Sequence, residues 1–365
     1  MLIDGAKGAE GGDGAQLEQV LHIQQLLLFA PHVSTTSALL GILKPFLRTG
    51  QPAVRMAAAK TLRHLAETNP FSLAEEGVEH DVISALDRES EPEIQATLRR
   101  VFIVVMEAGC GEVPTRWIQF CQNIILNETG SAGVEGAGGF GDDEDDDEDG
   151  GGGFGGGGEA EEPAEAEATG SCLETREFVM ECLCSVFRWV GDDGRHWDVS
   201  KAQGSPDGDW MVLKLQNLVN SGYKICTGNL PTLQPKGIHL LNILVEKFGD
   251  QPDPDYEGHQ LMEQYQAQLL SALRSAFEKS ALPTMTTVGL ELAASLIEKN
   301  ILSSDIGTLK RVVALMCKCL DYFDPQHEVH YSDSVVDRLK IGAIDSLSKL
   351  NLFLISTSIC RFLTC

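Results

Sequence analysis

Proline-opened helical segments recur along the chain, and this recurrence constrains the fold more than any other feature. Pro52 and Pro92 each begin a segment in which apolar residues return every three or four positions, and 40 residues separate them. Pro235 and Pro283 repeat the pattern 48 residues apart. Each interval holds two amphipathic helices. A single helix pair cannot bury its own apolar face, so pairs at this spacing are expected to stack as a HEAT- or armadillo-type α-solenoid.

We therefore expect an all-α chain. The predicted helices are residues 16–29, 37–48, 54–67, 72–86, 92–108, 114–127, 173–190, 208–225, 235–248, 256–277, 283–298, 304–320 and 334–350. Gly77 is expected to interrupt the fourth of these, and Gly109 to end the fifth. No window alternates apolar and polar residues at period two, and Asn-Gly hairpin turns are absent from the sequence. Tetratricopeptide repeats fit less well, because their period is about 34 residues.

An acidic, glycine-rich segment divides the predicted helices into two groups. Residues 131–170 contain fourteen Asp and Glu and no Lys or Arg, so they carry more than half of the net charge of −26. Like-charge repulsion and the backbone entropy of glycine predict disorder there. The expected organisation is a disordered N-terminus (1–15), a helical array (16–129), a disordered linker (130–171), a second array (172–350) and an apolar tail (351–365).

The motif QPAVRMAAAKTLRHLAE, residues 51–67, looks like the second helix of a HEAT repeat. A turn residue and a proline precede a Val-Arg pair, and three small residues, Ala57 to Ala59, would allow close approach to a neighbouring helix. Leu62 and Leu65 would extend the buried stripe. By this resemblance Arg55 should brace adjacent repeats through loop carboxylates or carbonyls, which is a structural role.

Two longer blocks carry a narrower resemblance. Residues 26–70 and residues 211–277 are similar to two segments of the very large HEAT-repeat proteins of the SWEETIE and HEAT-repeat-containing protein five family. The recognisable pieces LKLQNLV, GIHLLNILVEKFGD and LMEQYQAQLLSALRSAF lie in the second block, and both blocks occur in the family's order. Since this chain is several times shorter and ends in an apolar tail, we expect a fragment or truncated member.

The resemblance implies a scaffold without catalytic activity. Animal and fungal members of that family are associated with clathrin adaptor complex one and its accessory proteins, in traffic between the trans-Golgi network and endosomes. The plant branch is linked to carbohydrate balance. The expected partners are therefore proteins, and the expected location is the cytoplasm, peripheral to Golgi or endosomal membranes through indirect recruitment. A different HEAT scaffold, such as a nuclear-transport receptor or a phosphatase scaffold with basic partners, is the alternative.

Candidate chemistry in the sequence is sparse. His327 and His330 lie near Asp324, Glu328 and Asp333, residue types that bind zinc, but Pro325 and the polar surroundings predict a loop rather than a metal site. Cys182 with Cys184 and Cys317 with Cys319 are spaced two apart. That spacing points helical side chains in different directions, so buried small apolar residues are the better interpretation.

The remaining motifs exclude functions rather than suggest them. The glycines at 150–158 lack the Lys-Ser/Thr of a phosphate loop, and the acidic run Asp142–Asp149 lacks EF-hand spacing. An acidic chain is a poor ligand for nucleic acid, because phosphate contacts need clustered Lys and Arg. No stretch reaches the length of a membrane span. We therefore expect no catalytic residue, no metal, no cofactor and no small-molecule substrate.

Overall fold

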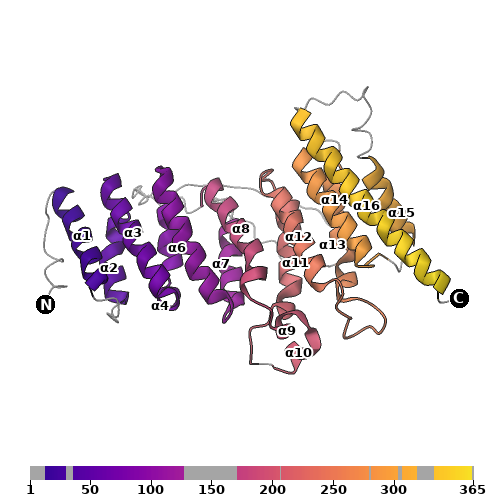
Figure 1. Cartoon of the computed structure of the whole chain (residues 1–365), viewed down its shortest axis with the longest axis horizontal. Helices are drawn as coiled ribbons and strands as arrows, with labels where there is room; N and C mark the ends of the chain where they lie inside the picture. Colours follow the sequence, from indigo (N-terminus) through magenta and orange to yellow (C-terminus); the bar gives the residue numbers. More distant parts are fainter. Residues whose placement is uncertain are drawn as a thin grey trace, which may run out of the picture.

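The computed structural model describes residues 13–29, 36–126, 171–205, 207–278, 281–302, 306–318 and 333–363. In these residues the regular structure is helical, and the one β-type pairing is an isolated bridge between Pro252 and Gln260. The helices stand side by side in one long row, with the two ends of the chain at opposite ends of it (Figure 1). The all-α prediction is confirmed.

The row has two layers of helices. In the first layer each helix contacts the next one in order: α1 (Asp13–Phe29), α3 (Pro52–Thr68), α6 (Pro92–Cys110), α8 (Leu173–Trp189), α12 (Gln234–Phe248), α14 (Pro283–Glu298) and α16 (Asp333–Leu363). The second layer packs on the first: α2 (Thr36–Phe46), α4 (Pro70–Glu75), α5 (Val78–Leu86), α7 (Pro114–Leu126), α11 (Leu215–Cys226), α13 (Gln266–Ala276) and α15 (Ile306–Lys318). Consecutive helices thus pair as hairpins and the hairpins stack, which confirms the predicted solenoid.

Prolines begin several first-layer helices, as the sequence predicted. Pro52 and Pro92 occupy the first turns of α3 and α6, and each follows a residue with extended backbone, Gln51 or Glu91. A first-turn residue needs no amide hydrogen for the helix, so proline costs nothing there. The apolar face that follows is buried between the layers. In α3 this face includes Ala58 and Leu62, which are 0% and 1% exposed.

The hairpins before and after residues 127–170 form one continuous array. The rings of Phe102 on α6 and Phe178 on α8 lie 5.6 Å apart, edge to face. The amide of Gln122 on α7 donates a buried hydrogen bond of 2.9 Å to the hydroxyl of Ser221 on α11. The two predicted arrays are therefore neighbours in space. We predicted disorder for residues 1–15 and 130–171, of which 1–12 and 130–170 lie outside the described part of the chain. The prediction was wrong for residues 13–15, which begin α1.

Two sequence predictions about helix boundaries were wrong. Residues 256–277 do not form one long helix, because the chain makes a loop to Gln260 and then η3 (Leu261–Tyr265) and α13. Gly258, with φ of 86°, and a capping box between Gln260 and Glu263 restart the helix at Leu261. Gly109 does not end its helix either, since α6 continues to Cys110.

The α8–α11 connection was also not predicted in detail. It contains two short helices, α9 (Gly194–Trp197) and α10 (Val199–Gln203), and a 3₁₀ turn, η2 (Met211–Lys214), before α11 begins. This excursion extends from the edge of the array (Figure 1). At the other end, α16 runs past residue 350 to Leu363, so the backbone of the predicted apolar tail continues the last helix up to that point.

Candidate binding surface

Arg55 joins two successive repeats, as its motif predicted. Its Nε donates to Oε2 of Glu89 at 2.8 Å and its Nη2 to Oε1 at 3.0 Å, a two-point contact with the α5–α6 turn. Nη1 also donates to the backbone oxygens of Thr49 and Gly50 at the preceding turn. The Glu89 side chain is only 3% exposed, and its carboxylate accepts further backbone hydrogen bonds. Arg55 is therefore a brace, and its charge is used internally.

Similar ion pairs connect other helices along the row. Arg116 on α7 pairs with Glu79 on α5, and Lys44 on α2 pairs with Asp81 on α5 at 2.7 Å. Lys236 on α12 contacts Glu181 on α8 at 2.8 Å. Lys299, after α14, pairs with Asp250, after α12.

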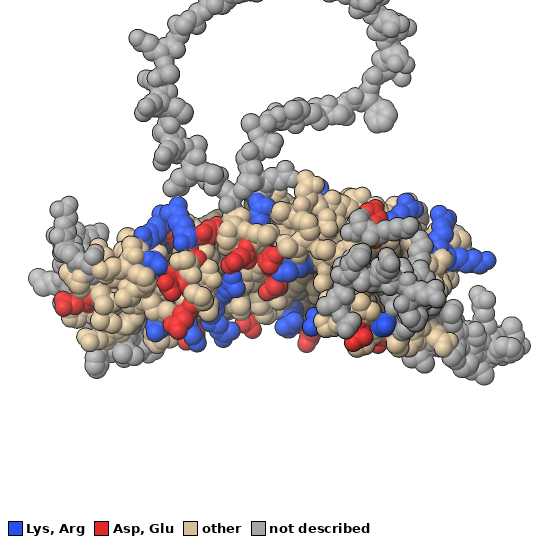
Figure 2. All heavy atoms as spheres, turned by 90° about the horizontal axis from the view of Figure 1, so that it is seen from above, with Lys and Arg blue, Asp and Glu red and all other residues tan. Residues whose placement is uncertain are grey.

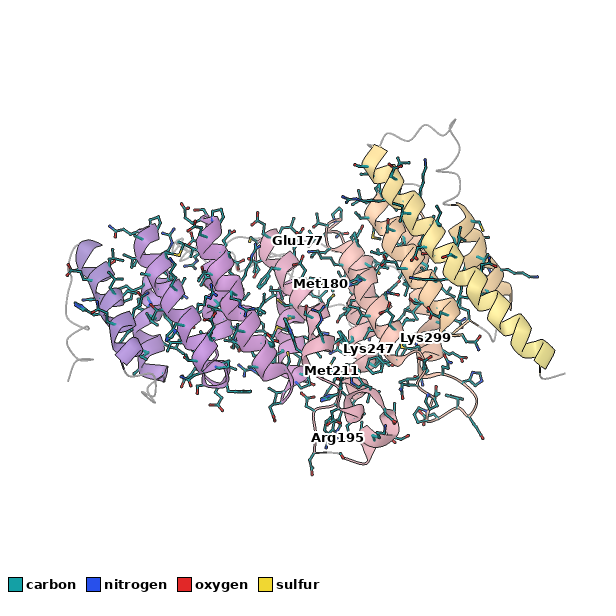
Figure 3. The ribbon with its side chains drawn as sticks, in the orientation of Figure 1. Glu177, Met180, Arg195, Met211, Lys247 and Lys299 are labelled. Carbon is teal, nitrogen blue, oxygen red and sulfur yellow. The ribbon has the colours of Figure 1, made fainter. Side chains whose placement is uncertain are left out.

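Much of the surface charge is therefore balanced locally between neighbouring repeats. On the face seen in Figure 2, Lys and Arg alternate with Asp and Glu along the array and do not form one basic surface. Glu177 lies on α8 near the upper edge of the row, whereas Lys247 and Lys299 lie near its lower edge (Figure 3). On the face seen in Figure 2, the described residues therefore form no broad phosphate-binding surface.

Polar side chains link the second-layer helices as well. The Asn217 amide on α11 lies 3.4 Å from the Gln122 side-chain oxygen on α7, beside the Gln122–Ser221 bond. Further along, Gln268 on α13 donates to Asn220 on α11 at 2.8 Å. Each contact fixes the register of one hairpin on the next, so the second layer behaves as a continuous side of the scaffold.

A cavity of about 270 Å³ opens where the two halves of the array meet. Its walls are Ile125 and Leu126 at the end of α7, Arg176 in the first turn of α8, Lys224 and Ile225 in the last turn of α11, and Gly228, Asn229, Leu230 and Leu233 in the α11–α12 turn. Its described lining thus combines five aliphatic side chains with two cations and no carboxylate. An apolar concavity with a few placed polar groups is the usual form of a binding site.

This cavity was not predicted from the sequence. We did not single out Arg176 or Lys224, because neither belongs to a recognised motif. One signal was present for Arg176: it lies three and four positions before Val179 and Met180, in the buried stripe of α8, and it is only 6% exposed. A buried arginine at an apolar helix position indicates a special environment.

Most of the candidate chemistry residues fall outside the part of the chain that the structure describes. His327, His330, Asp324, Glu328 and Cys319 lie outside the described residues, as does the acidic run Asp142–Asp149. In the described part of the chain no cluster of three or more His, Cys, Asp or Glu side chains could hold a metal ion.

Cys182 and Cys184 behave as small apolar residues. Cys182 is buried and Cys184 is half-buried, on different sides of α8. Burial raises the pKa of the Cys184 thiol to about 12, despite the nearby Lys236, and raises that of Cys182 further. Such thiols stay protonated at neutral pH, which makes them poor nucleophiles and poor metal ligands. Cys317, on α15, is exposed, so the interpretation of this cysteine as a buried residue was wrong.

Comparison with known proteins shows which HEAT-repeat proteins this chain is similar to. Residues 210–360 match the Laa1/Sip1/HEATR5 HEAT repeat region. The chain is 32% identical to protein SWEETIE of Arabidopsis thaliana over 355 residues, which is 93% of this chain but 16% of SWEETIE. It is 27% identical to the AP-1 accessory protein LAA1 of Saccharomyces cerevisiae over 124 residues, which is 34% of this chain and 6% of LAA1. The chain thus spans about a sixth of SWEETIE. No solved structure gives a significant match.

Proposed function

Because this chain belongs to the Laa1/Sip1/HEATR5 family of HEAT-repeat proteins, we propose that it is a non-catalytic scaffold in clathrin-adaptor-linked vesicle traffic between the trans-Golgi network and endosomes. Its work is to hold other proteins in fixed relative positions. The observation that carries this proposal is the stacked array itself, together with its relationship to a protein named for its association with AP-1.

The physical argument starts from the shape of the molecule. A solenoid has a large surface for its mass, and each added hairpin extends the same two sides by one step (Figure 1). The ion pairs and polar links between neighbours hold those sides in register, so that distant binding points keep their spacing. Rigid spacing between binding points is what a scaffold requires.

The described residues also favour binding over catalysis. Their cysteines are mostly buried, and two of the buried carboxylates, Glu79 and Glu89, are used by Arg116 and Arg55. Catalysis needs a nucleophile and a base that converge on an open pocket. The cavity between α7, α8 and α11 instead offers two cations and aliphatic walls, a composition suited to holding a ligand.

The adaptor connection rests on the yeast relative. LAA1 is named an AP-1 accessory protein, and the similarity of this chain to it over 124 residues supports a partner among clathrin adaptor complexes and their accessory proteins. No helix in the described residues could span a membrane. In this proposal the adaptor partner brings the chain to the cytoplasmic surface of Golgi and endosomal membranes.

Affinity capture tests this proposal. The tagged full chain is expected to recover adaptor subunits or their accessory proteins from an extract of the source organism, and the recovery should survive a wash at moderate salt. A variant carrying Gly237→Ala, which disrupts the α11–α12 contact, is expected to lose that recovery. Capture of basic localisation peptides at low salt, with no adaptor subunit recovered in repeated experiments, would instead support a nuclear-transport or phosphatase scaffold and contradict the proposal.

A further inference from the structure

The cavity between α7, α8 and α11 has a composition that selects one class of ligand. Arg176 and Lys224 supply two positive charges to its lining, and Ile125, Ile225 and Leu233 supply buried aliphatic surface. At about 270 Å³, it admits a few side chains of a peptide rather than a folded domain.

Helix dipoles do not decide the sign of its ligand. The cavity lies between the C-terminal ends of α7 and α11 and the N-terminal ends of α8 and α12. The partial charges of two C-termini and two N-termini oppose one another and favour neither sign, so the exposed ammonium of Lys224 is the charge that an incoming ligand meets. Lys224 is exposed at the cavity rim, where it can meet an incoming anion, and Arg176 forms part of the wall.

We propose that this cavity binds a short acidic peptide segment of a partner protein, in which a carboxylate is followed closely by a large aliphatic side chain. The carboxylate contacts Lys224 at the rim, and the aliphatic side chain lies against Ile225, Leu230 and Leu126. Charged groups at the rim and apolar contacts inside are the usual division of labour in peptide recognition. The proposal adds a partner chemistry to the scaffold function.

Fluorescence polarisation with synthetic peptides tests this site on the full chain. The probe is a labelled peptide with two acidic residues followed by two leucines. Its matched controls carry amides in place of the acids, or serines in place of the leucines. The acidic-leucine peptide is expected to bind, and each control peptide to bind at least about tenfold more weakly.

Variants at the rim connect the binding to this cavity. Lys224→Glu and Leu230→Ser are each expected to weaken binding by about tenfold or more, since they reverse a rim charge or remove an apolar contact. Lys60→Glu is the control, because it makes the same change in net charge at an exposed position on α3. It should change affinity less than about twofold. Circular dichroism confirms that each variant is folded.

Three results would overturn the proposal. Equal affinity for the amide peptide would show that charge plays no part, and equal weakening by Lys224→Glu and Lys60→Glu would show a general charge effect. Tight binding that appears only when Asp142–Asp149 are changed to amides would assign the cavity to the chain's own acidic segment. The titration contains no adaptor, so this inference and the trafficking proposal fail separately: loss of adaptor capture with intact peptide binding contradicts only the latter.

Discussion

Replacing Arg55 with methionine should uncouple the first repeats from the rest of the array. Methionine keeps an unbranched apolar side chain in α3 and removes only the guanidinium. The contacts that disappear are the two-point pair with Glu89 and the hydrogen bonds to the carbonyls of Thr49 and Gly50, all between 2.8 and 3.1 Å. Glu89 is left behind with its side chain 3% exposed.

The structure sets the size of the effect. Removing one partner of a buried pair costs about 3–5 kcal/mol, because the remaining charge is desolvated and uncompensated. Glu89 keeps hydrogen bonds from the amides of Ser90 and Glu91 at 3.0 Å each, which offset part of that cost. We expect a loss of about 3 kcal/mol. Arg63→Met removes an exposed i,i+4 pair with Glu67 and should cost less than about 0.5 kcal/mol.

The double variant separates the charge effect from lost packing. Glu89→Gln retains an acceptor for the two amides but no charge, so Arg55→Met combined with it leaves no unpaired buried ion. The two substitutions together should cost at least about 1.5 kcal/mol less than the sum of the single ones. Additive costs would show that Arg55 acts through its packing alone, and would refute the brace.

Hydrogen exchange with mass spectrometry is the assay, because a repeat array can open locally. In Arg55→Met, amides of α1 to α3 should exchange faster while those of α12 and α14 keep their wild-type rates.

The stabilisation that the Arg55–Glu89 pair provides also depends on pH. Burial acts to raise the pKa of Glu89, but hydrogen bonds from Arg55 and the backbone outweigh it and hold the pKa below its usual value. The stabilisation should therefore be complete above about pH 4.5 and decline as the pH falls further.

Three other perturbations test the packing and electrostatics. Gly237→Ala should destabilise the protein by about 2–3 kcal/mol in urea denaturation, because the new Cβ would lie 2.6 Å from the backbone nitrogen of Cys226. Gly41→Ala is the control: its new Cβ would have nothing within 4 Å, so this variant should be more stable by about 0.5–1 kcal/mol. Equal effects of the two substitutions would contradict the close packing at Gly237. His196 is 4% exposed and its ring lies 4.9 Å from that of Trp210, and this burial lowers the pKa of its imidazole. As the pH drops below about 6.5, the imidazole is therefore protonated in the unfolded chain before it is protonated in the folded one, and the stability of the protein should fall. His196→Phe should flatten that part of the pH profile, and an unchanged profile would count against the buried neutral imidazole. Cys182 should resist alkylation under native conditions while Cys317 reacts, as peptide mapping would show. Similar alkylation rates for the two thiols would contradict the burial of Cys182 on α8.

The sequence predicted the architecture because the solenoid depends on local patterns. Apolar periodicity and prolines at the first turn recur in each hairpin, and stacking is the way such hairpins bury their faces. These patterns are short-range features, and a single sequence contains them. The role of Arg55 was instead predicted from the resemblance of its motif to a HEAT repeat, since its partner Glu89 lies 34 residues further along the chain.

Features that depend on packing between distant residues were not predictable. Gly109 resembled a helix terminator, but it lies under Trp117: a Cβ at Gly109 would be 2.5 Å from the indole nitrogen, so its small size serves close packing. The cavity was missed for the same reason. It joins Leu126, Arg176 and Lys224, which are brought together only when the halves of the chain stack.

The most direct test of the account asks whether those halves stack without a covalent connection. Residues 1–135 and 165–365 would be co-expressed as two polypeptides, with an affinity tag on the first. If α7 packs on α8 and α11 as described, the untagged half should co-purify at a one-to-one ratio and elute with it as one species. Recovery of the tagged half alone, soluble and helical, would contradict a continuous array and remove the cavity that depends on it.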